Sequence, residues 1–410
     1  MSTPLAINPG DTAWVLVSTA LVLMMTPALA FFYGGMVRKK NVLSTLNLSF
    51  IMMGLISVQW VLFGYSLAFG PDVKGLIGDL SWAGLKGVDG NPLEAYSKTI
   101  PHLLFCAFQM MFAVITPALI TGTIVDRVRF KTFLVFAFLW STIVYDPLAH
   151  WVWGDGGWLK TMGALDFAGG TVVHIAAGFS ALAFALAIGP RKAYLSAPME
   201  PHNIPYTVLG AGLLWVGWFG FNAGSALAAD GLATYAFVNT NTATAAAALS
   251  WMFCSWAGEK PSVLGIATGA VVGLVAVTPA AGFVTPMGAM LIGAVAAPIS
   301  FYCIRLRQKL KLDDSLDVWA CHGMGGLTGA LMTGLLATKT VNEAGADGLF
   351  YGNPGQFMTQ ILACATTIVF VFVITFVLAK ILDAVMGLRV TQPEEEVGLD
   401  LSEHGERAYS

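Results

Sequence analysis

Long apolar stretches separated by short polar connections run through the whole chain. Runs of about 18 or more mainly apolar residues are typical of helices that cross a membrane. The pattern predicts eleven such helices, so the expected fold class is an all-α polytopic membrane protein. The predicted helices cover residues 12–36, 43–69, 101–125, 131–153, 168–189, 205–226, 233–257, 262–279, 287–306, 316–337 and 354–386.

Positive charge gathers in every second connection between these helices. Clusters such as Arg38-Lys39-Lys40 and Arg191-Lys192 alternate with connections that are nearly uncharged or whose lysines are balanced by acids. Because basic loops stay on the cytoplasmic side, we expect the N-terminus outside and the C-terminus in the cytoplasm. The expected location is the cell (inner) membrane, crossed many times.

Two of the predicted helices carry the same arrangement of an aspartate and a histidine. Asp166 precedes His174 by eight residues, and Asp314 precedes His322 by eight residues. Ionisable groups are costly in hydrocarbon, so such residues usually face a cavity or each other. Counting along the helices places His174 nearer the outer face and His322 nearer the inner face, offset by about 10 Å.

These two helices are the fifth and the tenth, which divides the chain into two halves of five. An odd number of helices in each half gives the halves opposite orientations, which is an inverted repeat. We expect repeat one at about 12–189, repeat two at about 205–337, and a long tilted eleventh helix at 354–386. Residues 1–390 then form one transmembrane unit, and residues 391–410 form a polar, acidic cytoplasmic tail.

Composition supports a membrane protein and excludes several other classes. Hydrophobic residues make up 56% of the chain and charged residues 11%, whereas a soluble domain carries about 25% charged residues. Mean hydropathy is +0.72. The net charge of -3 gives no indication of nucleic-acid binding. The region Met1 to Gly10 lacks the basic start of a signal peptide.

Metal binding and covalent catalysis find little support in the sequence. The five cysteines show no CxxC spacing and mostly sit in apolar runs, which is typical of small buried side chains. Two histidines and a carboxylate could hold a metal, but no third ligand is visible beside His174 or His322. No Gly-x-Ser-x-Gly nucleophile motif is present. We therefore predict no metal, no cofactor and no enzymatic activity.

Three motifs together resemble one known family. They are Asp166-Phe-Ala-Gly-Gly-Thr-Val-Val-His174, Gly217-Trp-Phe-Gly-Phe-Asn-Ala-Gly-Ser225 and Asp317-Val-Trp-Ala-Cys-His322-Gly. The chain resembles the Amt branch of the ammonium transporter (Amt/Rh) family from about Asp11 to its last residues. In that family, the two histidines are adjacent and hydrogen-bonded, which differs from the offset obtained by counting.

The resemblance also implies roles for individual residues. His174 and His322 would be the twin histidines of a hydrophobic pore, and Phe112 and Phe221 its stacked gate. Ammonium would be recruited at the entrance by Phe112, Trp153 and Ser225. Aromatic faces attract a cation by about 0.5–2 kcal/mol. Secondary pore-lining candidates are Phe108 and Trp218.

Asp166 has a role that the residues alone also suggest. An aspartate directly before a helix can accept hydrogen bonds from the free N–H groups of Gly169 and Gly170. Asn and Asp are almost equally good at such positions. The resemblance adds that Asp166 orients the recruitment site without touching the substrate.

The resemblance further implies function and partners. The expected function is movement of ammonium across the membrane as ammonia, with or without separate proton transfer, with methylammonium as an analogue. A homotrimer in membrane lipid and a PII-type signalling protein on the cytoplasmic face are the expected assemblies. The tail segment Gly398-Leu-Asp-Leu-Ser-Glu-His-Gly405 resembles the family's regulatory C-terminal segment.

Two alternatives share the fold. One is an ammonium sensor, which usually carries an appended signalling domain, whereas about 20 residues follow the last predicted helix here. The other is an Rh-type gas channel, which typically lacks the recruitment pair of Trp153 and Ser225. A third alternative, an intramembrane enzyme, is disfavoured by the uncharged pore.

Overall fold

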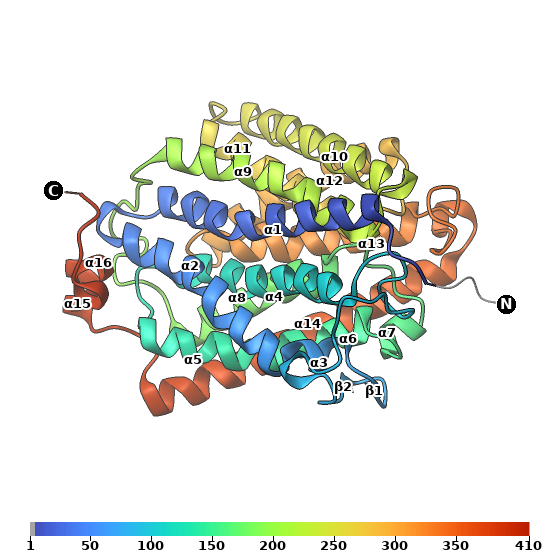
Figure 1. Cartoon of the computed structure of the whole chain (residues 1–410). Helices are drawn as coiled ribbons and strands as arrows, with labels where there is room; N and C mark the ends of the chain where they lie inside the picture. Colours follow the sequence, from blue (N-terminus) through green and yellow to red (C-terminus); the bar gives the residue numbers. More distant parts are fainter. Residues whose placement is uncertain (1–4, 410) are drawn as a thin grey trace.

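Eleven helical rods form one bundle in the computed structural model, which describes residues 5–409 (Figure 1). The first four residues of the predicted transmembrane unit and the last residue of the predicted tail lie outside this range. In chain order the rods are α1 (Pro9–Met36), α2 with α3 (Val42–Gln59, Tyr65–Phe69), α4 (His102–Ile124), α5 with α6 (Phe130–Trp140, Asp146–Trp153), the rod of α8 (Ala176–Ile188), α9 (Ile204–Ala223), α10 (Gly231–Trp256), α11 (Val263–Val277), α12 (Pro286–Lys309), the rod of α13 (Gly325–Leu336) and α14 (Pro354–Met386).

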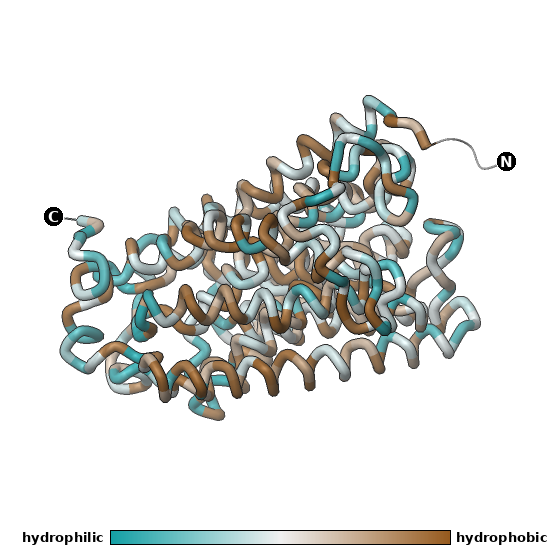
Figure 2. Tube along the Cα trace, turned by 60° about the horizontal axis from the view of Figure 1, so that its bottom comes forward, coloured by the Kyte–Doolittle hydropathy of each residue, from teal (hydrophilic) through white to brown (hydrophobic). Residues whose placement is uncertain are grey.

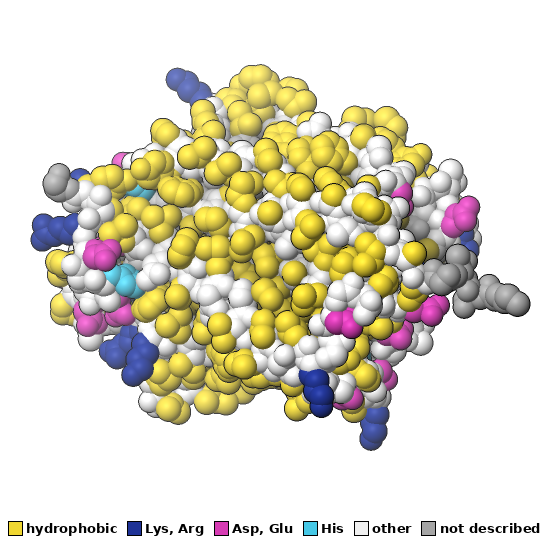
Figure 3. All heavy atoms as spheres, in the orientation of Figure 1, with side chains coloured by type: hydrophobic (Ala, Val, Ile, Leu, Met, Phe, Trp, Pro, Cys, Tyr) yellow, Lys and Arg dark blue, Asp and Glu magenta, His cyan; other side chains and the backbone are white. Residues whose placement is uncertain are grey.

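The rods follow the predicted order, and their ends agree with the predicted ends to within a few residues. Within the described range, eight helices are long and apolar enough to cross a membrane, and α11 is a shorter apolar helix. Figure 2 shows apolar residues along the middle of the rods and polar residues toward the ends of the bundle. On the face shown in Figure 3, charged side chains likewise gather toward the two ends. This distribution is that of a multi-pass membrane protein.

Four rods contain a π-helical segment, in which the backbone is locally wider than an α-helix. Two of these segments, Trp60–Gly64 and Ser141–Tyr145, interrupt the second and fourth rods. The other two, Gly170–Ile175 and Trp319–Met324, open the rods of α8 and α13 and contain the two histidines. Single π-helical turns inside α-helices are frequent at functional sites.

Two pairs of corresponding rods from the two halves pack against each other. α1 packs along α9, and the rod of α8 packs along the rod of α13. Glycines allow the second pair to approach closely. A Cβ atom on Gly178 would lie 2.1 Å from the backbone nitrogen of Gly323, and one on Gly326 would lie 2.8 Å from Cβ of His174. The contact is reciprocal, since each glycine follows its own histidine by four residues, as an inverted repeat requires.

The bundle has two distinct ends, which we call the N-terminal end and the tail end (Figure 1). The N-terminal end carries the connection after α3, with the short strands β1 (Asp72–Val73) and β2 (Ile77–Gly78), and the one-turn helix α7 (Trp158–Thr161). The tail end carries the two short helices α15 (Gln392–Val397) and α16 (Leu399–His404). α14 lies along α5, α8 and α13, and its opposite side remains exposed.

Candidate functional site

Two histidines touch in the middle of the bundle. Nδ1 of His322 lies 3.4 Å from Nδ1 of His174, and the ring centroids are 5.5 Å apart. Both side chains are buried. Because both atoms of the contact are Nδ1, one ring donates its proton and the other accepts it.

The offset obtained by counting residues is therefore wrong, and the adjacency implied by the resemblance is correct. The two rods begin at Gly170 and Trp319, later than the predicted starts at residues 168 and 316. They are also short, with 19 residues from Gly170 to Ile188. Each histidine lies in the first turns of its rod, and the two rods meet there in the middle of the bundle.

Aromatic rings continue from His174 toward the N-terminal end. The ring of His174 stacks on Trp218 at 5.4 Å and on Phe221 at 6.0 Å. The indole N–H of Trp218 donates to Oγ1 of Thr278 at 2.9 Å, which fixes the plane of the ring. Both α9 aromatic residues line a small cavity of about 10 Å³ with the two histidines. A cavity of that size holds about one water molecule.

Phe112 and Phe221 form the next barrier. Their ring centroids are 4.3 Å apart with an angle of 36° between the planes. Phe108 packs edge-on against Phe112 at 5.0 Å and is buried behind it. Phe221 lines the histidine cavity, and Phe112 lines a larger cavity at the N-terminal end. The two rings, which are tilted toward each other, therefore lie between these cavities.

The larger cavity, which we call the vestibule, has a volume of about 260 Å³ and brings together Phe112, Trp153 and Ser225. Trp153 meets Phe112 edge-on, with ring centroids 6.0 Å apart and planes 85° apart. The hydroxyl of Ser225 donates to the carbonyl of Phe221 at 2.8 Å, which leaves its oxygen lone pairs available to a donor. The lining is thus one of aromatic faces with few polar groups.

Among the vestibule residues that were not identified from the sequence, three carry polar groups: Tyr96, Gln109 and Lys160. Nζ of Lys160 donates to the carbonyl of Trp153 at 3.1 Å and lies 5.6 Å from the centre of the Tyr96 ring. Gln109 precedes Phe112 by three residues in an apolar run, so its polar amide could have indicated that this side of the helix faces a cavity. Tyr96 and Lys160 lie in connections, where the sequence gives no indication of what they face.

Asp166 lies beneath the vestibule and is buried. Its Oδ1 accepts from the backbone N–H groups of Gly169 (2.7 Å) and Gly170 (2.6 Å). Its Oδ2 accepts from the N–H of Thr171 at 2.7 Å, from the N–H of Val172 at 3.3 Å and from the Thr171 hydroxyl. The predicted cap is confirmed and is larger than predicted, since both carboxylate oxygens are used.

The backbone of Asp166 connects this cap to the vestibule. Its carbonyl accepts the indole N–H of Trp153 at 2.9 Å. The side chain of Asp166 does not belong to the described linings of the vestibule or of the histidine cavity. Gly169 has φ of +120°, a conformation that only glycine adopts without strain. Asp166 therefore holds the start of the histidine rod and the orientation of Trp153.

Gln360 of α14 holds the same segment from the other side and was missed in the sequence. Leu165, the residue before Asp166, donates its N–H to Oε1 of Gln360 at 2.7 Å and accepts from Nε2 at 2.8 Å. Nε2 also donates to the carbonyl of Ala330 in α13 at 3.1 Å. The amide lies in a helix that runs along the outside of the bundle, so its partner could not be found from the local sequence.

A third small cavity, of about 30 Å³, follows His322 toward the tail end. Besides His322 and apolar side chains, its lining includes Tyr33, Thr268, Asp317 and Cys321. Asp317 pairs with Arg307 at 2.6 Å. Vestibule, phenylalanine barrier, histidine cavity and this last cavity thus lie in sequence through the bundle. Within residues 5–409, no group of three or more His, Cys, Asp or Glu side chains could hold a metal.

Known proteins are similar to this chain over nearly its whole length. The model of the Ammonium Transporter Family matches residues 13–409. The ammonium transporter of Bacillus subtilis (strain 168) is 53% identical over 402 residues, covering 98% of each chain. Ammonium transporter Amt1 of Archaeoglobus fulgidus is 50% identical over 403 residues, covering 98% of this chain and all of that protein.

Solved structures show the same fold. The crystal structure of Saccharomyces cerevisiae Mep2 has a TM-score of 0.89 at 35% identity, and the match covers 95% of this chain and 89% of that one. A structure described as a sensor Amt protein has a TM-score of 0.88 at 28% identity, covering 96% and 98%. The chain therefore belongs to the ammonium transporter family.

Proposed function

We propose that this protein moves ammonium across a membrane by binding the cation in the vestibule and passing ammonia through the phenylalanine barrier to the histidine pair. The observation that carries this proposal is the order of the parts. An aromatic vestibule, two phenylalanines in contact and two touching histidines follow one another along a single line of cavities. Each part suits one form of the substrate.

The vestibule suits the cation. Trp153 and Phe112 present aromatic surfaces, which attract a cation most strongly where water is partly excluded. The Ser225 oxygen can accept a hydrogen bond from an ammonium N–H, since the hydroxyl proton is already donated to Phe221. Ammonium recruitment by Phe112, Trp153 and Ser225 follows from these two interactions.

The barrier suits the neutral molecule. Beyond the stacked rings the path is narrow and mostly apolar, with a cavity of about 10 Å³ around the histidines. Burying an ion without a partner costs far more than burying a small neutral polar molecule. A proton is therefore left behind at the barrier, or travels separately, while ammonia proceeds.

The histidine pair suits ammonia as a hydrogen-bonding molecule. Nε2 of His174 is buried and has no hydrogen-bond partner within residues 5–409. A buried polar atom of this kind can bond a molecule in the cavity. When one Nδ1 donates to the other, the two Nε2 atoms take opposite roles, one as acceptor and one as donor.

Orientation and assembly complete the proposal. The basic clusters Arg38-Lys39-Lys40 and Arg191-Lys192 lie at the tail end, so the tail end is the cytoplasmic one and the vestibule opens outside. The chain then forms a homotrimer in the cell membrane and binds a PII-type protein on its cytoplasmic face. Residues 1–390 form the transporting unit, residues 391–410 regulate it, and the protein performs no covalent chemistry on its substrate.

Transport is the better supported of the two functions found in the family. The protein is 53% identical to a transporter and 28% identical to the sensor. The Trp153 and Ser225 pair favours an Amt-type mechanism over an Rh-type gas channel.

The function is tested with purified protein in proteoliposomes. Methylammonium uptake should exceed that of empty liposomes and should saturate with concentration. Trp153→Leu should raise the methylammonium concentration that is needed to saturate uptake. Trp256→Leu, a change at an exposed tryptophan at the end of α10, should leave that concentration unchanged. Uptake equal to that of empty liposomes would refute transport, and equal effects of the two variants would refute the recruitment site.

A further inference from the structure

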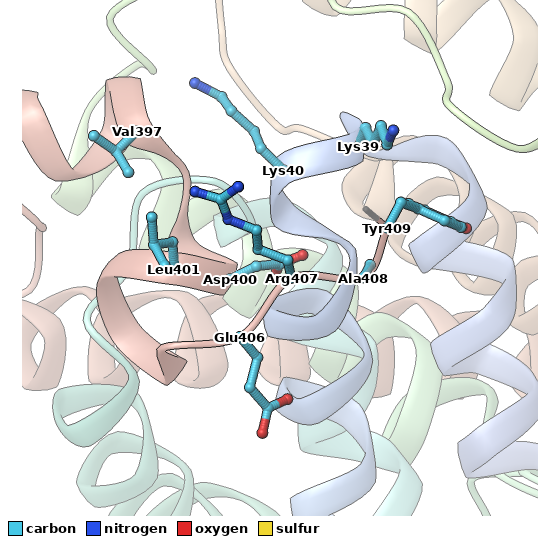
Figure 4. Close-up of a pocket in the computed structure, with 9 residues that line it drawn as sticks. All are labelled: Lys39, Lys40, Val397, Asp400, Leu401, Glu406, Arg407, Ala408 and Tyr409. Carbon is cyan, nitrogen blue, oxygen red and sulfur yellow. The ribbon is translucent and has the colours of Figure 1, made fainter.

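A cavity with basic walls lies between the chain end and the connection that follows α1 (Figure 4). Its volume is about 330 Å³, which falls within the range of about 300–1,000 Å³ typical of ligand sites. Lys39 and Lys40 come from the connection, and Arg407 and Tyr409 come from the chain end. Segments that are remote in sequence thus form one basic concavity.

Two acidic residues, Asp400 and Glu406, line this cavity together with the three basic ones. Oδ1 of Asp400 accepts the backbone N–H of Ser44 at 2.8 Å and is occupied at the start of α2. Burial raises the pKa of Asp400, and backbone hydrogen bonds offset this shift only in part. In Figure 4 the carboxylate of Glu406 points away from the side chains of Lys40 and Arg407.

The three basic side chains differ in how far they are already engaged. Lys40 donates to the carbonyl groups of Glu395 (3.1 Å) and Glu396 at the end of α15. Nζ of Lys39 lies 5.2 Å from the centre of the Tyr409 ring. Arg407 forms no ion pair or side-chain hydrogen bond within the described part of the chain and is exposed. Its planar guanidinium has the geometry that binds phosphate through two parallel hydrogen bonds.

We propose that this cavity binds a phosphate-bearing anion between Arg407, Lys39 and Lys40. The shared chemistry is a phosphate group carrying one or two negative charges. Two sources can present it at this end of the bundle: a soluble phosphate compound and the headgroup of an anionic lipid. The site is independent of the transport mechanism proposed above.

A ligand in this cavity contacts both the tail and the connection after α1, and so links the tail to the bundle. The same connection holds the tail through Asn41, whose Oδ1 accepts the N–H of Leu399 at 2.8 Å. Asn41 also donates to Asp126, which pairs with Arg191 at 3.2 Å. An anion that bridges Arg407 to Lys39 therefore adds to existing contacts and stabilises the docked tail. A ligand that binds only the docked form shifts the equilibrium toward it.

Hydrogen–deuterium exchange of residues 399–409 in the full-length protein tests the proposal. One arm adds inorganic pyrophosphate to protein in neutral detergent, and the other compares nanodiscs of phosphatidylglycerol with nanodiscs of phosphatidylcholine. We expect exchange to slow by about threefold or more in at least one arm, with saturation in the pyrophosphate arm. Protection by pyrophosphate identifies a soluble ligand, and protection only by phosphatidylglycerol identifies a lipid headgroup.

Variants separate a site from general charge effects. The double variant Lys39→Gln/Arg407→Gln should lose the protection, whereas Lys260→Gln, which removes a basic residue between α10 and α11 at the same end, should keep it. Arg407→Lys should retain part of it because the charge remains. The absence of protection in both arms, or its persistence in Lys39→Gln/Arg407→Gln, would overturn the proposal.

Discussion

Gln360 and Leu165 pair like two residues of neighbouring strands, although Gln360 belongs to a helix. The side-chain amide accepts the N–H of Leu165 at 2.7 Å and donates to its carbonyl at 2.8 Å. Through Leu165 the last transmembrane helix holds Asp166, and through the carbonyl of Asp166 it holds Trp153. The vestibule is thus positioned by a helix that contributes no side chain to the vestibule lining described above.

Replacing Gln360 should damage this support. Gln360→Leu leaves the N–H and carbonyl of Leu165 without their partner in a buried segment, which costs about 1–3 kcal/mol per group. We expect a lower melting temperature and a lower maximal transport rate. Thr359→Val is the matched control, since Thr359 lies beside Gln360 in α14 but its hydroxyl donates to Gly355 within the same helix. Equal transport by wild type and Gln360→Leu would contradict this role.

Asp166 gives a second prediction, which departs from what the sequence suggested. By N-cap preference alone, Asn should replace Asp at little cost. Here both carboxylate oxygens accept backbone N–H groups, and Asn has only one acceptor oxygen. Asp166→Asn should therefore lower both the melting temperature and transport, as Asp166→Ala does, with the Ala variant more affected. An Asn variant with unchanged stability and uptake would show that one oxygen suffices.

Lys160 should reduce the affinity of the vestibule for ammonium. Its own ammonium group already occupies the carbonyl of Trp153 and the face of Tyr96, and it repels a second cation. Lys160→Gln keeps a donor for that carbonyl but removes the charge. We expect the KM for methylammonium to fall by about two- to fivefold, and the effect to shrink at high ionic strength.

Lys98→Gln provides the control for this measurement, since Lys98 lies at the same end of the bundle, in the connection before α4, but outside the vestibule lining. It should leave KM unchanged. A higher KM in Lys160→Gln would mean that the lysine supports Trp153 rather than opposing the substrate.

An ion pair at the tail end should make stability depend on pH in the acidic range. Burial raises the pKa of Asp313, but Arg127 and the hydrogen-bonded Arg191 outweigh it, so the pKa lies below its usual value. Because the pKa is lower in the folded state, the pair stabilises the fold above the unfolded value of about 3.9 and loses this contribution as the pH falls through the folded pKa.

Asp313→Asn isolates this contribution. The melting temperature of the wild type should exceed that of Asp313→Asn by a constant amount between pH 7 and about pH 5. The difference should shrink as the pH falls below about 4. A difference that does not change with pH would indicate that the amide disturbs packing and that the charge of Asp313 contributes little.

The rods of this fold could be predicted because each one must span the bilayer and pair its own backbone polar groups. Length and hydrophobicity of a segment suffice for that, and all eleven predicted segments form rods. The depth of a single residue within the bundle could not be predicted in this way. Counting residues from the predicted rod ends gave an offset between His174 and His322, whereas the packing of the two rods brings the rings together.

The candidate site was predictable where a local motif marks it. The Asp166 cap lies within six residues of chain, so its hydrogen bonds follow from local geometry. Lys160 and Gln360 act on residues that only the tertiary structure brings near. Gln360 lies 195 positions from Leu165, and nothing in the sequence around either residue indicates the other.

The histidine pair allows the most direct test of the account. Uptake of methylammonium and the accompanying current should be measured in proteoliposomes for wild type and for His174→Ala/His322→Ala. His202→Ala, a change in the connection before α9, is the control. We predict that the double variant folds, as shown by its melting temperature and elution volume, but loses ion-coupled transport. Unchanged methylammonium uptake and current in His174→Ala/His322→Ala would contradict the proposed path through the two histidines.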